Sequence, residues 1–331
     1  MKALVGFFKL VRPVNLFIIV FTMVAMRWGV INGLTSRFEH SASLQLEHWK
    51  FGLSVLVMVL LAAAGNIIND YFDVRVDRIN KPQKVIIGKE VKRRVAMITH
   101  HAFNAVAVFI GCFLAFDSGK YWIGLVPIVM GTLLWYYSIH FKKAPWVGNF
   151  VVALMVAVVP LWSGVFEIPL MTEVYEVTAE PSRANFDMGF LYKLTLWAAL
   201  IGFSLFAFWL TLIREVIKDL EDFRGDYAAG FRTLPIVWGK KKSKVYVAVL
   251  YALFFLVLTW ISPVVIDYAN QITQPWQLWA MLGLGVIVPS VFSLVKVMKA
   301  KRKVDYTHAS TAVKVVMAFG ILSGLMMYFW H

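Results

Sequence analysis

The sequence has almost no cysteine and little charge. Its one cysteine, Cys112, stands inside an apolar run of a 331-residue chain, which excludes an intramolecular disulfide and a metal site built on several thiolates. Charged residues make up only 16% of the chain, whereas hydrophobic residues make up 60%, and the mean hydropathy is +0.70. An ordinary soluble domain has an apolar fraction nearer one half, so the composition excludes that class. A cleavable signal peptide is not expected, because the first apolar run is long and no small-residue cleavage site clearly closes it.

What the chain has instead is a series of long apolar runs. Each is about 18 to 22 residues long, which is the length that a helix needs to cross roughly 30 Å of hydrocarbon. The runs are continuous rather than alternating, which disfavours a β-barrel. We therefore predict an all-α integral membrane protein, one domain over residues 1–331, with spans at residues 14–34, 51–69, 95–116, 121–140, 147–168, 194–215, 245–266, 277–297 and 311–330.

Basic residues outnumber acidic ones by 33 to 19, and the net charge is +14. A balance this basic could indicate binding to nucleic acid, but in a multispan protein it more often marks the loops that face the cytoplasm. Most of the Lys and Arg residues fall at the N-terminus and in the loops after spans two, four, six and eight. We therefore predict that the N-terminus and these loops are cytoplasmic, that the protein lies in the cell (inner) membrane, and that nucleic acid is not a partner.

Two acidic segments stand at the cytoplasmic ends of spans two and six. Each has three aspartates spaced by three and then four residues, namely Asp70, Asp73 and Asp77 in the first and Asp219, Asp222 and Asp226 in the second. On a helix this spacing brings the three carboxylates to one face, and Asn66 and Glu215 share those faces four residues earlier. Four crossings separate the segments, so we predict an internal repeat of two helices that run in the same direction. A basic, turn-rich stretch follows each segment and ends in Gly88-Lys89 or Gly239-Lys240.

Six converging carboxylates would repel one another unless cations were present. Hard cations such as Mg²⁺ bind carboxylate and amide oxygens and leave positions open for phosphate oxygens, and Asn66 and Asn69 supply amides. Basic side chains are interleaved with the acids, so a diphosphate held through Mg²⁺ is the ligand that this pattern favours. The candidate diphosphate-binding residues near the two segments are Arg78, Lys81, Lys84, Lys218, Arg224 and Arg232.

Other interpretations of the acids are weaker. A juxtamembrane salt-bridge network is common for one acidic run, but two runs with the same spacing on the same face make it less favoured. A calcium loop lacks its ligand alternation and central glycine. A cation-coupled transporter would place its acids near the bilayer midplane on broken helices. A scaffold that binds anionic lipid through basic loops would not need the repeated acids.

Asn69-Asp70-x-x-Asp73-x-x-x-Asp77 and Asp222-x-x-x-Asp226 resemble the paired NDxxDxxxD and DxxxD motifs of the UbiA superfamily of intramembrane prenyltransferases. The stretch from Lys218 to Pro235 and the Arg12-Pro-Val-Asn15 sequence are similar to the branch of digeranylgeranylglyceryl phosphate synthases. That resemblance implies nine helices around a central cavity that opens to lipid. It also implies Mg²⁺-dependent transfer from a polyprenyl diphosphate to a membrane-associated acceptor.

The resemblance further implies residue roles. The catalytic carboxylates would be Asp73, Asp77, Asp222 and Asp226, and the metal ligands would be Asn69, Asp70, Asp73, Asp77, Asp219, Asp222 and Asp226. Asn66 and Glu215 would support these ligands, and Asn15 would contact the acceptor. A geranylgeranylglyceryl-phosphate-type lipid leads among acceptors, and an aromatic quinone precursor or a chlorophyllide-type molecule is the alternative.

The family often has a Tyr-x-x-x-Lys after span four. Here the spacing from Tyr137 to Lys142 is one residue too long, so Lys142 could contact phosphate or could be an ordinary positive anchor. His140 in this segment is left out of the predicted site. The acidic stretch at residues 167–187 is predicted to be an external surface excursion without chemistry.

Overall fold

The computed structural model describes residues 2–36, 43–80, 82–178, 183–272 and 274–329. Within these ranges nearly every residue is helical, and the only strand-like pairing is an isolated bridge between Ile87 and Val91. The α-helices are α1 (Lys2–Val11), α2 (Pro13–Val24), α3 (Asn32–Thr35), α4 (His48–Asn80), α5 (Arg93–Asp117), α6 (Leu125–Ile139), α7 (Val147–Gly164), α8 (Glu167–Thr178), α9 (Arg183–Ala228), α10 (Leu234–Asn270), α11 (Pro275–Ala280), α12 (Val288–Lys299) and α13 (Lys303–Met326).

Short helical pieces of other pitch join or interrupt these helices. Two are π-helical, η1 (Ala25–Ile31) between α2 and α3 and η5 (Met281–Ile287) between α11 and α12. Three are 3₁₀ turns, η2 (Pro82–Lys84), η3 (Tyr121–Gly124) and η4 (Phe141–Lys143). The η4 turn lies directly after α6 and carries Lys142, which belongs to the predicted site.

Nine helical segments in the described part of the chain are long and apolar enough to cross a membrane. They coincide with the nine predicted spans and confirm the all-α membrane fold. The second and sixth are longer than expected, since α4 has 33 residues and α9 has 46. At 1.5 Å per residue these helices are about 50 Å and 69 Å long, well beyond the thickness of the hydrocarbon. Both acidic segments therefore continue the membrane helices as helix rather than as loop.

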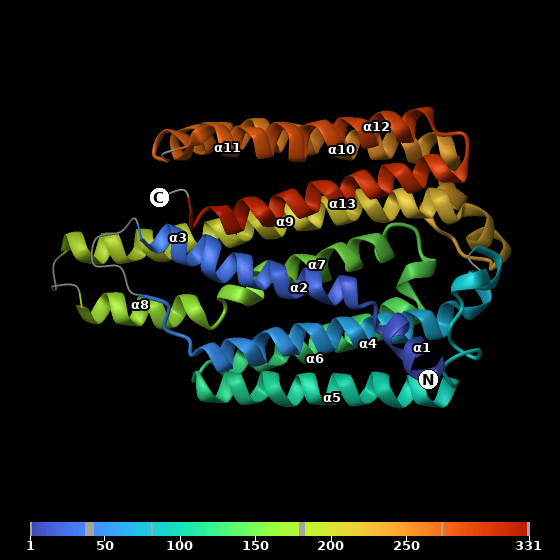
Figure 1. Ribbon diagram of the computed structural model, residues 1–331, viewed down its shortest axis with the longest axis horizontal. Helices are drawn as coiled ribbons and strands as arrows, with labels where there is room; N and C mark the ends of the chain where they lie inside the picture. The colour runs from blue at the N-terminus through green and yellow to red at the C-terminus, as the bar shows by residue number, and fades with distance from the viewer. Residues whose placement is uncertain (1, 37–42, 81, 179–182, 273, 330–331) are drawn as a thin grey trace.

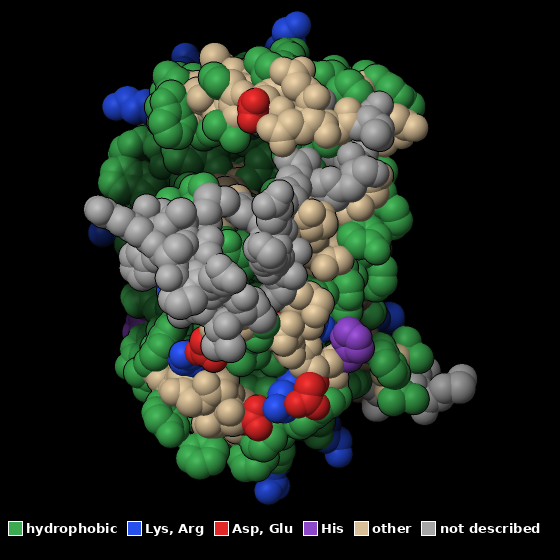
Figure 2. All heavy atoms as spheres, turned by 90° about the vertical axis from the view of Figure 1, so that its left-hand side faces the viewer, with side chains coloured by type: hydrophobic (Ala, Val, Ile, Leu, Met, Phe, Trp, Pro, Cys, Tyr) green, Lys and Arg blue, Asp and Glu red, His purple; other side chains and the backbone are tan. Residues whose placement is uncertain are grey.

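The helices form one elongated bundle, with α5, α4 and α6 on one side and α10 and α12 on the other (Figure 1). The helices α4 and α9 run in the same direction, as the repeat predicts, and both acidic segments lie at the end where α1 lies. Large apolar side chains are exposed on the flanks, including Phe109, Phe116 and Trp260. Figure 2 shows hydrophobic side chains around the sides of the bundle at its opposite end, as expected for a surface that contacts lipid.

The glycines of the two Gly-Lys positions of the repeat both have a positive φ. Gly88 has φ 84° and Gly239 has φ 79°, both in the left-handed region that glycine occupies without steric cost. At Gly239 this conformation breaks α10, so that a short apolar piece precedes the membrane helix.

The acidic stretch at residues 167–187 differs from the prediction where it begins. Glu167, the first residue of α8, is wholly buried and pairs with wholly buried Arg27 of η1, with Nε of Arg27 2.7 Å from Oε2. The other carboxylate oxygen accepts a bond of 3.0 Å from the Leu46 amide. The prediction of a surface excursion was wrong for Glu167, because the sequence does not reveal its distant partner.

Candidate active site

The two acidic segments meet where α4 ends. The side chain of Asn80, the last residue of α4, bonds α9 twice, by donating to the Asp222 carbonyl at 3.3 Å and by accepting from the Gly225 amide at 3.1 Å. A Cβ on Gly225 would overlap the Asn80 side chain, so glycine is required for this close approach. The two predicted sets of oxygen ligands are therefore held side by side at one end of the bundle.

Basic side chains from other elements engage the first acidic segment. Arg12 pairs with Asp70 through one of its terminal nitrogens. Lys142 of η4 pairs with Asp73, and its Nζ also donates to Oδ1 of Asn69 at 3.3 Å. The Lys142 side chain is only 8% exposed, so its charge is largely removed from water. A buried ammonium needs anionic partners, and the lysine therefore belongs to the site rather than to the loop surface.

Arg12 reaches Asp70 because the chain turns sharply between α1 and α2. Its backbone is left-handed, with φ 56°, and Pro13 follows at the first position of α2, where its missing N–H is not needed. Asn66 fixes the same turn by donating to the Val11 carbonyl at 3.1 Å. Asn66 thus holds the turn that carries Arg12, and its role beside the metal ligands stays a prediction.

The second segment is held by a residue of α7, by residues of its own helix and by the loop that follows it. Asp219 accepts a bond of 2.9 Å from the side chain of Asn149 on α7. Glu215 pairs with Arg214 at 2.8 Å and with Lys218 at 3.4 Å on its own helix. Asp226 is buried, and its carbonyl accepts a 2.9 Å bond from the amide of Phe231. The part of α9 that carries the acids is thus well ordered by contacts with its surroundings.

Lys303, the first residue of α13, connects the two segments. Its Nζ lies 3.3 Å from Oδ1 of Asp222 and 3.4 Å from the carbonyl of Asn80. Asp305 fixes the start of α13 by accepting bonds from the amides of Lys301 and Arg302. This capping places the lysine at the junction of α4 and α9.

Electrostatic interactions join the two sets of acids. Tyr137 near the end of α6 interacts with Asp73 of the first segment and with Glu215 and Asp219 of the second. Arg12 interacts with Glu215 as well as with Asp70. Tyr137 and Arg12 thus each lie within electrostatic range of carboxylates from both segments.

The chemistry of these donors fits a hard divalent cation. The two segments present carboxylate oxygens together with the amide oxygen of Asn69, which are the ligands that Mg²⁺ prefers. In the conformation described, Lys142 and Lys303 bond Asp73 and Asp222, and within the described ranges no group of three or more His, Cys, Asp or Glu residues is close enough to hold one ion. The donor set fits the metal, and binding would require the carboxylates to exchange lysine contacts for metal contacts.

Both acid-bearing helices are continuous through their aspartates. A cation-coupled transporter of the type considered above would place its acids on broken helices near the bilayer midplane. The acids here lie instead near the ends of two overlong helices, beside basic side chains. The geometry therefore favours binding of a polyanion.

Not all of the predicted residues join this site. Arg78, Arg224 and Asn15 are exposed, and Lys218 bonds Glu215 on its own helix. Lys81 lies outside the described residues, and the side chain of Lys84 is not described either. The roles predicted for these residues stay predictions.

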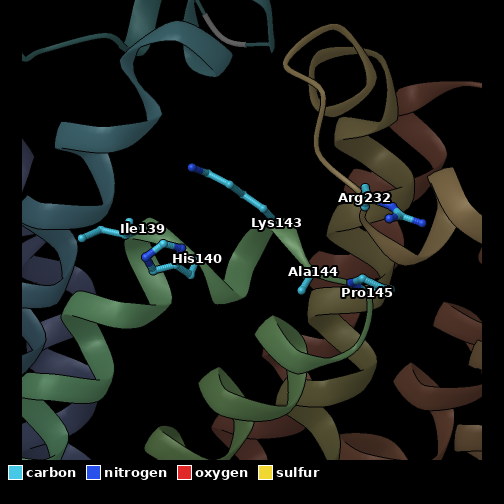
Figure 3. A pocket seen from close by; sticks show the side chains of 6 residues that line it. All are labelled: Ile139, His140, Lys143, Ala144, Pro145 and Arg232. Carbon is cyan, nitrogen blue, oxygen red and sulfur yellow. The ribbon is translucent and has the colours of Figure 1, made fainter.

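Arg232 lies apart from the acids, at a pocket of about 520 Å³. Figure 3 shows the side chains that line it, with Lys143 and Arg232 on different sides and His140 on the turn after α6. The complete lining is Ile139, His140, Lys143, Ala144, Pro145 and Arg232. The sequence singled out Arg232, but it gave no reason to place His140 and Lys143 beside it.

The prediction also missed four residues that contact the acidic segments, Arg12, Asn80, Asn149 and Lys303. Arg12 stands within the Arg-Pro-x-Asn sequence, so its motif was a usable signal. Lys303 ends a run of basic residues. The sequence does not show which residue of this run contacts the acidic segment. No sequence spacing indicates the contacts of Asn80 and Asn149, because their partners lie far away in the chain.

Comparison with known proteins agrees with this geometry. The family described as the UbiA prenyltransferase family matches residues 33–310. The digeranylgeranylglyceryl phosphate synthase of Methanopyrus kandleri is 30% identical over 320 residues, which cover 97% of this chain and 98% of that protein. The synthase of the same name from Methanothermobacter thermautotrophicus is 30% identical over 257 residues, with 78% and 74% of the two chains covered.

Solved structures share the fold. A UbiA homologue from Aeropyrum pernix K1 matches with a TM-score of 0.56 and 15% identity, over 92% of this chain and 98% of that chain. A structure described as one of digeranylgeranylglyceryl phosphate synthase in membranes matches with a TM-score of 0.55 and 20% identity, over 98% and 99%. The chain belongs to the UbiA prenyltransferase family and is a multi-pass membrane enzyme that transfers prenyl groups.

Proposed function

We propose that the enzyme transfers a polyprenyl group from a polyprenyl diphosphate to a geranylgeranylglyceryl-phosphate-type lipid. The observation that carries the proposal is the convergence of two acidic segments, with Arg12, Lys142 and Lys303 among them, at one end of a membrane bundle. The choice of acceptor is supported by relatives named digeranylgeranylglyceryl phosphate synthase, one of which aligns over nearly the whole chain.

The cofactor that we propose is Mg²⁺, held by Asn69, Asp70, Asp73, Asp77, Asp219, Asp222 and Asp226. When bound, Mg²⁺ would act as a Lewis acid that neutralises charge on the diphosphate oxygens. Asp73, Asp77, Asp222 and Asp226 are the proposed catalytic carboxylates. Asn66 and Glu215 would hold the segments that carry them.

The basic residues of the chain would hold the leaving group. Lys142 and Lys303 already lie at the carboxylates, and Arg12 interacts with both segments, so all three can turn to diphosphate oxygens. Fixed positive charge in a site with little water stabilises the negative charge that develops as the allylic C–O bond breaks. The oxygen of the acceptor hydroxyl then forms the new bond to the allylic carbon, and its proton passes to an oxygen of the departing diphosphate.

We also propose that the chain is a single domain and that the end with the acidic segments faces the cytoplasm across the cell membrane. The support for this orientation is the excess of Lys and Arg in the loops at that end. The isoprenoid tails would then lie among the membrane helices, next to lipid.

An acceptor-by-donor panel with the protein purified in detergent tests the proposed function. Polyprenyl diphosphates of several lengths would each be combined with geranylgeranylglyceryl phosphate, homogentisate or chlorophyllide, and the products would be read by mass spectrometry. We expect prenylated product with the glycerol phosphate lipid, loss of turnover in excess EDTA, and recovery with added Mg²⁺. Product with an aromatic or chlorophyllide acceptor and none with the lipid would contradict the proposed acceptor, and transfer that resists EDTA would contradict the metal role.

A further inference from the structure

The pocket at Arg232 lies between the turn after α6 and the loop between α9 and α10. Its floor is the η4 turn and the residues that follow, and Arg232 lines it from the loop between α9 and α10. Two backbone bonds join these loops to the site. The Arg232 amide donates to the Lys143 carbonyl at 2.9 Å, and the Phe231 amide donates to the Asp226 carbonyl at 2.9 Å.

The lining of this pocket is basic. Lys143 and Arg232 are cationic, and none of the lining residues is acidic. Lys143 and Arg232 are exposed, and in the described part of the chain neither pairs with a carboxylate. Arg12, Lys142 and Lys303, in contrast, all pair with aspartates. Positive charge that no carboxylate neutralises favours an anionic ligand.

This pocket is a neighbour of the carboxylate site but is separate from it. Lys142, which bonds Asn69 and Asp73, directly precedes Lys143 in the η4 turn. Consecutive Cα atoms are about 3.8 Å apart, so the two lysines reach adjacent regions from one turn. The pocket therefore adjoins the carboxylate site along the backbone of this turn, with Lys142 turned to the carboxylates and Lys143 exposed at the pocket.

We propose that this pocket binds the phosphate monoester of the acceptor lipid, and this inference rests on the proposed function. The reaction brings two phosphorylated substrates together, and their negative charges repel one another unless each has its own counter-charge. The donor diphosphate takes the side with the carboxylates and metal. The acceptor phosphate is joined to the attacking hydroxyl by only a few bonds of glycerol, so it needs a cationic pocket next to that site.

Kinetics with Lys143→Met, Arg232→Met and the double variant test this inference, with the KM of each substrate measured separately. We expect the KM for geranylgeranylglyceryl phosphate to rise about tenfold or more in each single variant, because each loses a charge-assisted contact. The donor KM should stay within about twofold, since its site is intact, and this result also shows that the variant is folded. Lys143→Arg and Arg232→Lys should recover part of the acceptor affinity.

Lys241→Met is the matched control, because Lys241 is an exposed lysine near the start of α10 that does not line the pocket. It removes the same charge and should leave both KM values unchanged. A rise in the donor KM alone would assign the pocket to the diphosphate and would overturn the inference. Unchanged KM values in the double variant, or an equal rise for both substrates, would also overturn it.

A binding experiment separates failure of this inference from failure of the proposed function. Glycerol 1-phosphate would be titrated into detergent-purified wild type and double variant by calorimetry. If wild type does not prenylate the glycerol phosphate lipid, the proposed function fails, but weaker binding of this probe to the variant still supports a phosphomonoester pocket. Equal binding to both proteins overturns the pocket assignment.

Discussion

The cationic partners of Asp70 and Asp73, in the first acidic segment, come from outside α4. Arg12 comes from the turn between α1 and α2, and Lys142 comes from the turn after α6. A half-buried carboxylate is costly without a counter-charge, and removing one member of such a pair leaves the other uncompensated. These residues therefore bring three parts of the chain together at the site.

Replacing Asp73 or Asp222 by Asn should lower prenyl transfer by more than about 100-fold. Loss of a residue that only supports a metal ligand costs about 10- to 100-fold, so loss of a proposed ligand should cost more. The asparagine keeps the size of the side chain, and membrane expression should persist. Product formation by purified variants, measured at saturating donor and acceptor, checks this.

Glu221→Gln provides the control for these variants. Glu221 adjoins Asp222 on α9, but its carboxylate accepts a 3.0 Å bond from Thr307 on α13 and is not one of the proposed ligands. It should retain wild-type activity. Full activity of the Asp73 or Asp222 variant, at a level equal to this control, would refute the metal assignment.

The sequence predicted the acids at the site better than it predicted their partners. Helical spacing alone placed Asp70, Asp73 and Asp77 on one face, and α4 bears this out. Lys142 was uncertain because its spacing from Tyr137 departs from the family motif, yet it reaches Asn69 and Asp73. Lys303 and Asn149 could not be predicted, because their contacts depend on how helices distant in the chain pack together.

At the scale of elements, the approach of α4 to α9 depends on one small residue. Gly225 leaves room for the side chain of Asn80, which bonds the backbone of α9 at two points. In a helix interior, glycine is less favourable than alanine by about 1 kcal/mol. Its presence here is explained by the contact between the helices, which sets the separation of the two sets of ligands.

Gly225→Ala should lower kcat/KM by about 10- to 100-fold, because a shift of about 1 Å in reacting groups can cost that much. The added methyl group would displace Asn80 and move α4 away from α9. Steady-state kinetics with both substrates would measure the loss. Adding Asn80→Ala to this variant should recover part of the activity, since it removes the overlap.

Gly202→Ala is the matched control on the same helix, because a Cβ at Gly202 would meet nothing within 4 Å. It should leave kcat/KM unchanged, since it changes only the helix propensity of α9. Equal activities for the Gly225 and Gly202 variants would show that this close approach does not set the geometry of the site.

The sequence was enough to predict the membrane helices. It was not enough to predict the residues at which they end or their π-helical turns. Long apolar runs gave all nine spans, but hydropathy falls at the acids, so the predicted second span stopped at residue 69 although α4 continues to Asn80. The acid spacing itself indicated that the helix continues. The π-helical turns η1 and η5 have no such signal, because they result from packing between neighbouring helices.

At the scale of the whole molecule, a second charged cluster lies at the end opposite the active site. Arg27 and Glu167 are both wholly buried there, and they join η1, α8 and the segment before α4. Arg27 also lies over the rings of Trp28 and Phe51, at 5.0 Å and 4.6 Å from their centroids. This network fixes the far end of the bundle and takes no part in the proposed chemistry.

Glu167→Gln should destabilise the protein by about 3 to 5 kcal/mol, because it leaves the Arg27 charge buried without its counter-ion. A lower midpoint of thermal unfolding in detergent would show this. Glu173→Gln is the control, since Glu173 lies on the same helix but is 57% exposed, where its pair with Lys120 contributes about 1 kcal/mol or less. If both variants unfold at the wild-type temperature, the buried pair does not stabilise the bundle.

Because α4 and α9 run in the same direction, every charged group of the proposed reaction lies at one end of the bundle. Moving a unit charge through a bilayer against an electrical potential of 100 mV involves about 2.3 kcal/mol. With both proposed sites at that end, neither diphosphate nor glycerol phosphate would have to make that passage. Turnover should thus be indifferent to the membrane voltage, and the cell can run this step whether or not its membrane is energised.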